Sequence, residues 1–289
     1  MANTYFLFQN ILVRNVLTDY TGVKRTFGIF IIRNRGGHHE SKRNEIAKEA
    51  NQKWFRGTAF SGAGHDPEFQ EIARRFLCGD VTGHGTLTDV QKALIRLAAL
   101  TACQTWKPLA QYARSALDVG AAPVEIKETL YQCAPYIGLE KVQCALDEVN
   151  QVFQEMNAGL PADGQSTVSE ETRFEKGLAV QREIFGADTI DSMRAAAPAE
   201  LRHIQRYLSE YCFGDFYTRG TLDLKMRELI TFCAICCLGG CEPQAKAHAG
   251  ANLSVGNTRE TLIEAITQCL PLIGFPRTLN AINCIEAVK

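Results

Sequence analysis

The sequence predicts an all-α protein built from two tandem repeats, because one pattern occurs twice at a constant spacing. A Val-Gly turn, a glutamate and a Gln-Cys-x-Pro-x-Ile-Gly run all recur 136 residues later: Val119-Gly120, Glu128 and residues 132–138, then Val255-Gly256, Glu264 and residues 268–274. A repeat at fixed spacing indicates two structurally similar units. Convincing strand patterns are missing after residue 46, whereas helical spacing of apolar residues is common.

Helix start signals support this class. Thr88 and Gln91 have the spacing of a capping box, in which each side chain binds the backbone N–H of the other residue. Pro123 suits the first position of the next helix, where its missing N–H has no helical partner anyway. Thr258 is expected to cap the equivalent helix of the second copy.

Glycines mark the ends of the preceding helices. Gly120 and Gly256 suit the left-handed conformation that commonly follows a helix. Each copy is therefore expected to contain four or five helices joined by short connections.

The domain organisation follows from the extent of the repeat. We expect an N-terminal extension over residues 1–45, a degenerate first repeat over 46–156 and a second repeat over 166–289, with a linker of Gly, Pro and Ser between them. Residues 27–32 fit a short strand and residues 33–39, including His38-His39, a loop. The extension as a whole is expected to be poorly ordered.

Composition excludes several functional classes. The 289-residue chain has a formal net charge of -1, which gives no electrostatic reason to expect nucleic acid or an anionic membrane as partner. An apolar run of transmembrane length is missing. The first residues lack a basic segment and make a poor secretory signal.

Cysteine usage predicts a reducing, cytoplasmic environment. There are 11 cysteines, an odd number, and most of them occupy apolar positions of helical patterns. Disulfide frameworks are typical of small secreted chains rich in loops. Reduced, buried cysteines that pack as small hydrophobic residues are the better interpretation.

Only the second copy keeps an ionisable pair. It carries Glu228 and His248, whereas the first copy has Ala93 and Tyr112 at the corresponding positions. This difference suggests that one unit is kept for chemistry and the other for architecture.

The second copy contains Arg227-Glu228-Leu229, then Gly239-Gly240-Cys241, then His248 followed by the second Val-Gly turn. This pattern resembles the carboxymuconolactone decarboxylase family, which includes the alkylhydroperoxidase D type. The resemblance covers nearly all of residues 165–289 and, through the repeat, extends more weakly over about 50–153. It implies two alkylhydroperoxidase D-like helical units per chain.

The peroxidase branch of that family uses a Cys-x-x-Cys pair followed by histidine. Here Cys241 matches the first cysteine, but Gln244 occupies the second position. Position 244 lies one helical turn before His248, whereas Cys241 lies two turns before it. A lone thiol at a helix N-terminus can be activated, but a dithiol cycle needs a resolving partner that glutamine cannot provide.

The decarboxylase branch needs only the Glu and the His. Loss of CO₂ from a lactone acid leaves an enolate-like carbanion that must be protonated, which a histidine oriented by a carboxylate can do. The resemblance therefore implies that His248 is the general acid or base and Glu228 its partner, with Cys241 and Gln244 lining the pocket. It implies no metal and no organic cofactor.

Simpler interpretations remain open for each residue. Glu228 fits a solvated helix residue paired with Arg227 or Lys225, and His248 fits a structural histidine. Cys233-x-x-Cys236, with nearby Cys237, has the spacing of a zinc motif. The first copy, however, has small residues at these positions, which indicates packing inside a helix.

Three functional hypotheses follow. The first is a cofactor-free decarboxylase or related lyase that acts on a small carboxylated lactone. The second is a thiol-dependent alkyl hydroperoxide reductase that uses Cys241 with another cysteine. The third is a non-catalytic accessory subunit. Apolar helix faces favour a homo-oligomer, and the resemblance implies rings, so that a trimer of two-unit chains would mimic a hexamer.

Overall fold

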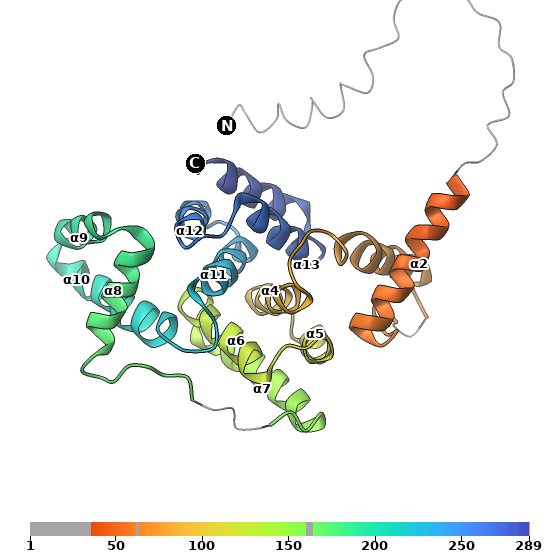
Figure 1. The fold of residues 1–289 in the computed structure, drawn as a ribbon, viewed down its shortest axis with the longest axis horizontal. Helices are drawn as coiled ribbons and strands as arrows, with labels where there is room; N and C mark the ends of the chain where they lie inside the picture. The colour runs from red at the N-terminus through yellow and green to blue at the C-terminus, as the bar shows by residue number, and fades with distance from the viewer. Residues whose placement is uncertain (1–35, 62–63, 160–163, 289) are drawn as a thin grey trace, which may run out of the picture. The chain divides into compact units, whose positions relative to one another are not determined.

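The computed structural model describes residues 36–61, 64–159 and 164–288, and it is helical in class (Figure 1). Over these residues it contains no strand, as the sequence predicts. The strand expected over residues 27–32 lies outside the described part of the chain. Residues 39–289 form one compact unit. None of the described helices is long and apolar enough to cross a membrane.

Helices of the first half run from α2 to α7. Their bounds are α2 Gly36–Phe55, α3 Pro67–Arg74, the π-helical η1 Arg75–Val81, α4 Asp89–Ala102, α5 Trp106–Asp118, α6 Pro123–Ile137 and α7 Leu139–Glu155. The loop expected up to residue 39 is wrong in part, because α2 already begins at Gly36. Residues 36–39 form the first turn of an uninterrupted helix, although Gly36-Gly37 is by itself a turn signal.

The second half repeats this order. Its elements are α8 Arg173–Phe185, α9 Ala187–Ala196, the 3₁₀ turn η2 Ala199–Leu201, α10 Arg202–Tyr207, the π-helical η3 Leu208–Tyr217, α11 Leu224–Leu238, α12 Glu242–Ser254 and α13 Arg259–Glu286. α13 is kinked at Gly274, whose φ of 74° is positive. Gly138 has a φ of 99° at the equivalent junction between α6 and α7. The order α4, α5, α6 and α7 is therefore matched by α11, α12 and the two parts of α13.

The expected caps are present. Thr88 and Gln91 form the capping box of α4, and Pro123 begins α6. Thr258 accepts a hydrogen bond from the backbone N–H of Thr261 at 3.1 Å. Gly120 and Gly256 have φ values of 99° and 92°, the left-handed conformation predicted for both.

α2, which begins before the expected first-repeat boundary at residue 46, corresponds to α8 of the second repeat. In α2, Arg43 Nε donates to Asp80 at 2.9 Å, and in α8, Arg173 Nε donates to Asp215 at 2.9 Å. Next to these aspartates, Gly79 and Gly214 let the π-helical segments approach α2 and α8 closely. We propose that the first repeat begins within α2, upstream of residue 46, because Arg43 takes part in this shared arrangement.

The two repeats pack together through reciprocal contacts. α4 lies against α11 in the middle of the unit (Figure 1), α6 of the first repeat packs on α11, and α13 of the second packs on α4. One continuous core contains buried residues of both, including Leu94 and Ile230. Burial of apolar surface from both repeats favours their folding together.

The repeated glutamates tie each repeat to the other. Glu264 on α13 accepts hydrogen bonds from the backbone N–H groups of Thr86, at 2.6 Å, and Leu87, at 3.0 Å, just before α4. Glu128 on α6 accepts from Arg219, at 2.8 Å, and Arg227, at 3.1 Å, around the start of α11. The shared glutamate thus positions the N-terminus of the other repeat's central helix.

Candidate active site

Glu228 and His248 meet in the second repeat. Glu228 lies on α11 and is fully buried, and His248 on α12 is 8% exposed. His248 Nδ1 lies 2.8 Å from Glu228 Oε2. An ionised carboxylate can only accept, so Nδ1 carries the hydrogen and Nε2 keeps its lone pair in the neutral ring. Nε2 has no hydrogen-bond partner among the described residues.

This geometry decides between the open interpretations of Glu228. It is not a solvated residue paired with Arg227 or Lys225, because its side chain is fully buried and pairs with His248. Arg227 instead donates to Glu128 at 3.1 Å. Asn252 Nδ2 donates to the backbone oxygen of Glu228 at 3.0 Å and so joins α12 to α11.

Tyrosines complete the surroundings of the carboxylate. Tyr217 of η3 donates its hydroxyl to Glu228 Oε1 at 2.7 Å and lies 3.0 Å from the Thr231 hydroxyl. The Tyr136 hydroxyl lies 3.0 Å from that of Tyr217. Burial raises the pKa of both phenols well above 10, so they remain protonated donors at neutral pH.

Two aromatic rings flank the histidine. Tyr136 of α6 and Phe185 of α8 pack edge-on against the His248 ring, with centroid distances of 5.3 and 5.4 Å. Both rings restrict the imidazole to one orientation, which a proton-transfer group requires. Tyr136 belongs to the first repeat, so that repeat contributes to the site of the second.

The structure places the other two expected site residues elsewhere. Cys241 lies at the start of α12, and its Sγ contacts the Gly239 backbone oxygen at 3.6 Å rather than Glu228 or His248. Gln244 is exposed and makes no hydrogen bond to His248. The roles assigned to them from the resemblance stay predictions.

The cavity beside Cys241 is small. It has a volume of about 20 Å³, is lined by Cys241, Cys236 and Arg277 among others, and does not reach His248. In the described part of the chain no three Cys, His, Asp or Glu side chains converge as a metal site would require. Cys233, Cys236 and Cys237 are instead packed in the interior of α11.

Sequence reasoning missed three contributors: Tyr136, Phe185 and Tyr217. Tyr217 donates directly to Glu228, a contact between residues of different helices that helical spacing does not predict. Tyr136 occupies a variable position of the repeated Gln-Cys-x-Pro-x-Ile-Gly run, where the other copy has Leu272. This difference between the copies is the signal in the sequence that could have pointed to Tyr136. Phe185 lies upstream of the residues compared in the repeat.

The fold and this Glu–His site define a class: a tandem, all-α protein with a buried Glu–His pair in its second repeat, in contact with Tyr136 of the first. The chain belongs to the Carboxymuconolactone decarboxylase family, which matches residues 67–151 and 202–287, one stretch in each repeat. It is also similar to the 4-carboxymuconolactone decarboxylase of Acinetobacter baylyi (strain ATCC 33305 / BD413 / ADP1). That similarity is 26% identity over 121 residues, which cover 42% of this chain and 90% of the relative.

Proposed function

We propose that the second repeat is a cofactor-free carboxy-lyase site that acts on a small carboxylated lactone. The observation that carries the proposal is the buried Glu228–His248 pair, with Nδ1 and Oε2 2.8 Å apart and Nε2 unpartnered in the described structure. The similarity to a 4-carboxymuconolactone decarboxylase supports the choice of substrate class.

The chemistry assigns one role to each residue. In the decarboxylation, the C–C bond to the carboxylate breaks, CO₂ leaves, and the electron pair moves into the conjugated lactone carbonyl. His248 Nε2 takes a proton from solvent and delivers it to the resulting carbanion. Glu228 fixes the ring tautomer and stabilises the imidazolium, and Tyr217 holds the carboxylate in place.

Turnover of 4-carboxymuconolactone by the full chain tests the proposal. We expect release of one CO₂ per lactone consumed, without added metal or thiol. Absence of lactone turnover together with rapid, thiol-dependent peroxide reduction would replace it with the hydroperoxide reductase hypothesis. Absence of both activities would favour the accessory subunit.

We also propose that the chain forms a homo-oligomer, a trimer as the family resemblance implies. Large apolar side chains are exposed at corresponding positions of both repeats: Phe69 and Ile72 on α3, and Ile204 and Tyr207 on α10. Leu139 and Phe275, 60% and 61% exposed, also correspond. Such patches typically mark interfaces. Light scattering on the eluted protein should give three times the chain mass, and a monomer at micromolar concentration would contradict it.

The interior cysteines support a cytoplasmic location. Eight of the 11 thiols are buried within helices, two more are half-buried, and all 11 are free. We propose that the protein functions in a reducing compartment, where such thiols persist. Fractionation of the source cells should recover it with cytoplasmic markers.

A further inference from the structure

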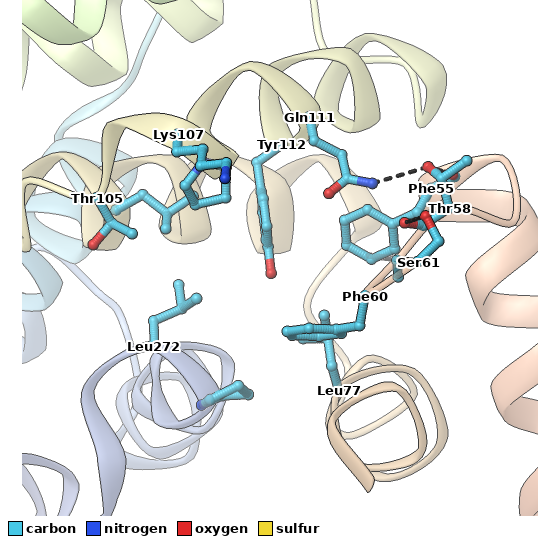
Figure 2. Close-up of a pocket in the computed structure, with 14 residues that line it drawn as sticks. Phe55, Thr58, Phe60, Ser61, Leu77, Thr105, Lys107, Gln111, Tyr112 and Leu272 are labelled. Atoms are coloured by element: carbon cyan, nitrogen blue, oxygen red, sulfur yellow. Dashed lines mark hydrogen bonds between the residues drawn. The ribbon is translucent and has the colours of Figure 1, made fainter. Parts of the chain in front are cut away.

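A larger cavity lies in the repeat that has lost its acid–base pair. It has a volume of about 610 Å³ and occupies the place in the first repeat that corresponds to the surroundings of His248. Apolar side chains from four helical segments form much of its wall, including Phe55, Leu77, Leu100 and Leu272. Figure 2 shows Phe60 and Leu77 on one side of the cavity and Leu272 on another.

Tyr112 brings a hydrogen-bond donor into this apolar cavity. Its side chain is 7% exposed, and Figure 2 shows the hydroxyl pointing into the space between Leu272 and Leu77. The hydroxyl has no hydrogen-bond partner among the described residues. Burial raises the pKa of Tyr112 to about 12, while the charge of Arg96 acts in the opposite direction. At neutral pH the hydroxyl is therefore protonated and can donate a hydrogen bond to a bound ligand.

Arg96 is a buried cation without a counter-ion. Its side chain is fully buried on α4, one turn before the cavity residue Leu100. Nη2 donates to the Thr82 hydroxyl at 2.9 Å and to Gln268 Oε1 at 2.7 Å, and the guanidinium lies 4.6 Å from the Trp54 ring centroid. These partners are all neutral.

The guanidinium is also incompletely hydrogen-bonded. Nε and Nη1 of Arg96 have no partner, and no carboxylate of the described residues lies within ion-pairing distance. A buried, unpaired charge is costly, because desolvation is not repaid by attraction to an opposite charge. An anion bound in the adjacent cavity would supply that attraction.

We propose that the first-repeat cavity binds a small aromatic or aliphatic acid, with its apolar body against the cavity walls and its carboxylate accepting from Tyr112. Arg96 does not itself line the cavity but contributes positive charge from the adjacent interior. Lys107, which lines the cavity, contributes a second cation. Ala93 replaces the catalytic glutamate, so this site binds its ligand without an acid–base pair to transform it. The inference is independent of the lyase chemistry proposed for the second repeat.

Calorimetric titration of the full chain with benzoate tests this site. We expect saturable binding of one benzoate per chain. Tyr112→Phe keeps the ring that packs edge-on against Phe55 at 5.2 Å but removes the donor. Loss of a hydrogen bond to a charged group should weaken binding on the order of 10- to 100-fold. Benzamide, of the same shape but neutral, should bind more weakly than benzoate.

Two further variants separate this site from the lyase site. His248→Ala should bind benzoate with unchanged affinity, whereas Arg96→Met should bind it more weakly after its folding has been checked by circular dichroism. Tyr112→Phe should leave lactone turnover unchanged, so failure of the lyase proposal and failure of this one give different results.

Several outcomes would overturn the inference. One is the absence of saturable binding of both benzoate and hexanoate. Another is equal benzoate affinity in wild type, Tyr112→Phe and Arg96→Met. Loss of binding in His248→Ala alone would assign the ligand to the second repeat. A changed oligomeric state of Tyr112→Phe, without benzoate binding to wild type, would mean that a second copy covers the cavity.

Discussion

The two repeats share an arrangement of helices and aromatic rings, but they differ in the polar residue at its centre. In the second, His248 packs edge-on against Phe185 at 5.4 Å; in the first, Tyr112 packs edge-on against Phe55 at 5.2 Å. His248 also contacts Tyr136 on α6 of the first repeat. Tyr112 lines a cavity together with Leu272, the residue of α13 that corresponds to Tyr136. The backbone positions the ring, and the residue type decides whether it exchanges a proton near pH 7.

The residues one turn along the central helices also differ. Thr231 in the second repeat is a neutral residue that hydrogen-bonds to Tyr217 and Gln132, whereas Arg96 in the first is a buried cation. The first repeat, which lacks counterparts of Glu228 and His248, therefore carries a buried cation of its own. The comparison indicates that the first repeat has a different electrostatic environment and a cavity in the same place.

The largest expected effect is on turnover in His248→Ala. Removal of a positioned acid–base group should lower kcat on the order of 100- to 10,000-fold. Tyr112→Phe is the matched control, since it changes the corresponding ring and leaves the second repeat intact. Steady-state rates with 4-carboxymuconolactone, measured beside melting temperatures, check both. Wild-type turnover in His248→Ala would remove the functional difference between the repeats.

Buried arginines give the next contrast. Arg227 and Arg219 both pair with Glu128, which is 1% exposed. Arg227→Met therefore leaves this buried carboxylate with Arg219 as its remaining ion-pair partner. Breaking a buried pair costs about 3–5 kcal/mol of unfolding free energy. Arg96→Met removes a cation that has no counter-ion and should cost less or stabilise the protein. Urea unfolding of both variants measures this, and a greater loss in Arg96→Met would contradict the unpaired assignment.

Glu228→Gln should lower turnover less than His248→Ala does. The amide no longer supplies the negative charge that stabilises the imidazolium, but the ring stays in place. We expect a loss of about tenfold or more in kcat, which corresponds to about 1.4 kcal/mol of transition-state free energy. Ala93→Gln, the matched change in the first repeat, should leave kcat unchanged although it can disturb packing. Equal effects of the two substitutions would argue against a catalytic pair.

Cys241→Ser should have the smallest effect on lactone turnover. Its Sγ contacts the Gly239 oxygen and is not part of the Glu228–His248 network. Parallel assays of lactone turnover and thiol-dependent peroxide reduction check this expectation. Loss of a robust peroxide activity in this variant would place the thiol hypothesis first.

Local signals predicted much of the helical frame. The Thr88 capping box, Pro123 at the start of α6 and the left-handed Gly120 and Gly256 are all observed, because these features depend on residues within one turn. The start of α2 at Gly36 was missed, since this part of the chain has no counterpart at the 136-residue offset. The Arg43–Asp80 pair that links α2 to the first repeat joins residues distant in sequence.

The sequence by itself determined the all-α class, the two repeats and the single copy with Glu228 and His248, because spacing and residue type are local properties. Only the tertiary structure showed that these side chains lie 2.8 Å apart, that Tyr217 and Tyr136 complete their surroundings, and that Cys241 and Gln244 do not join them. It also showed Arg96 without a counter-ion next to a cavity. Helix packing decides these relations, because it brings together side chains from both repeats that no spacing along the chain connects.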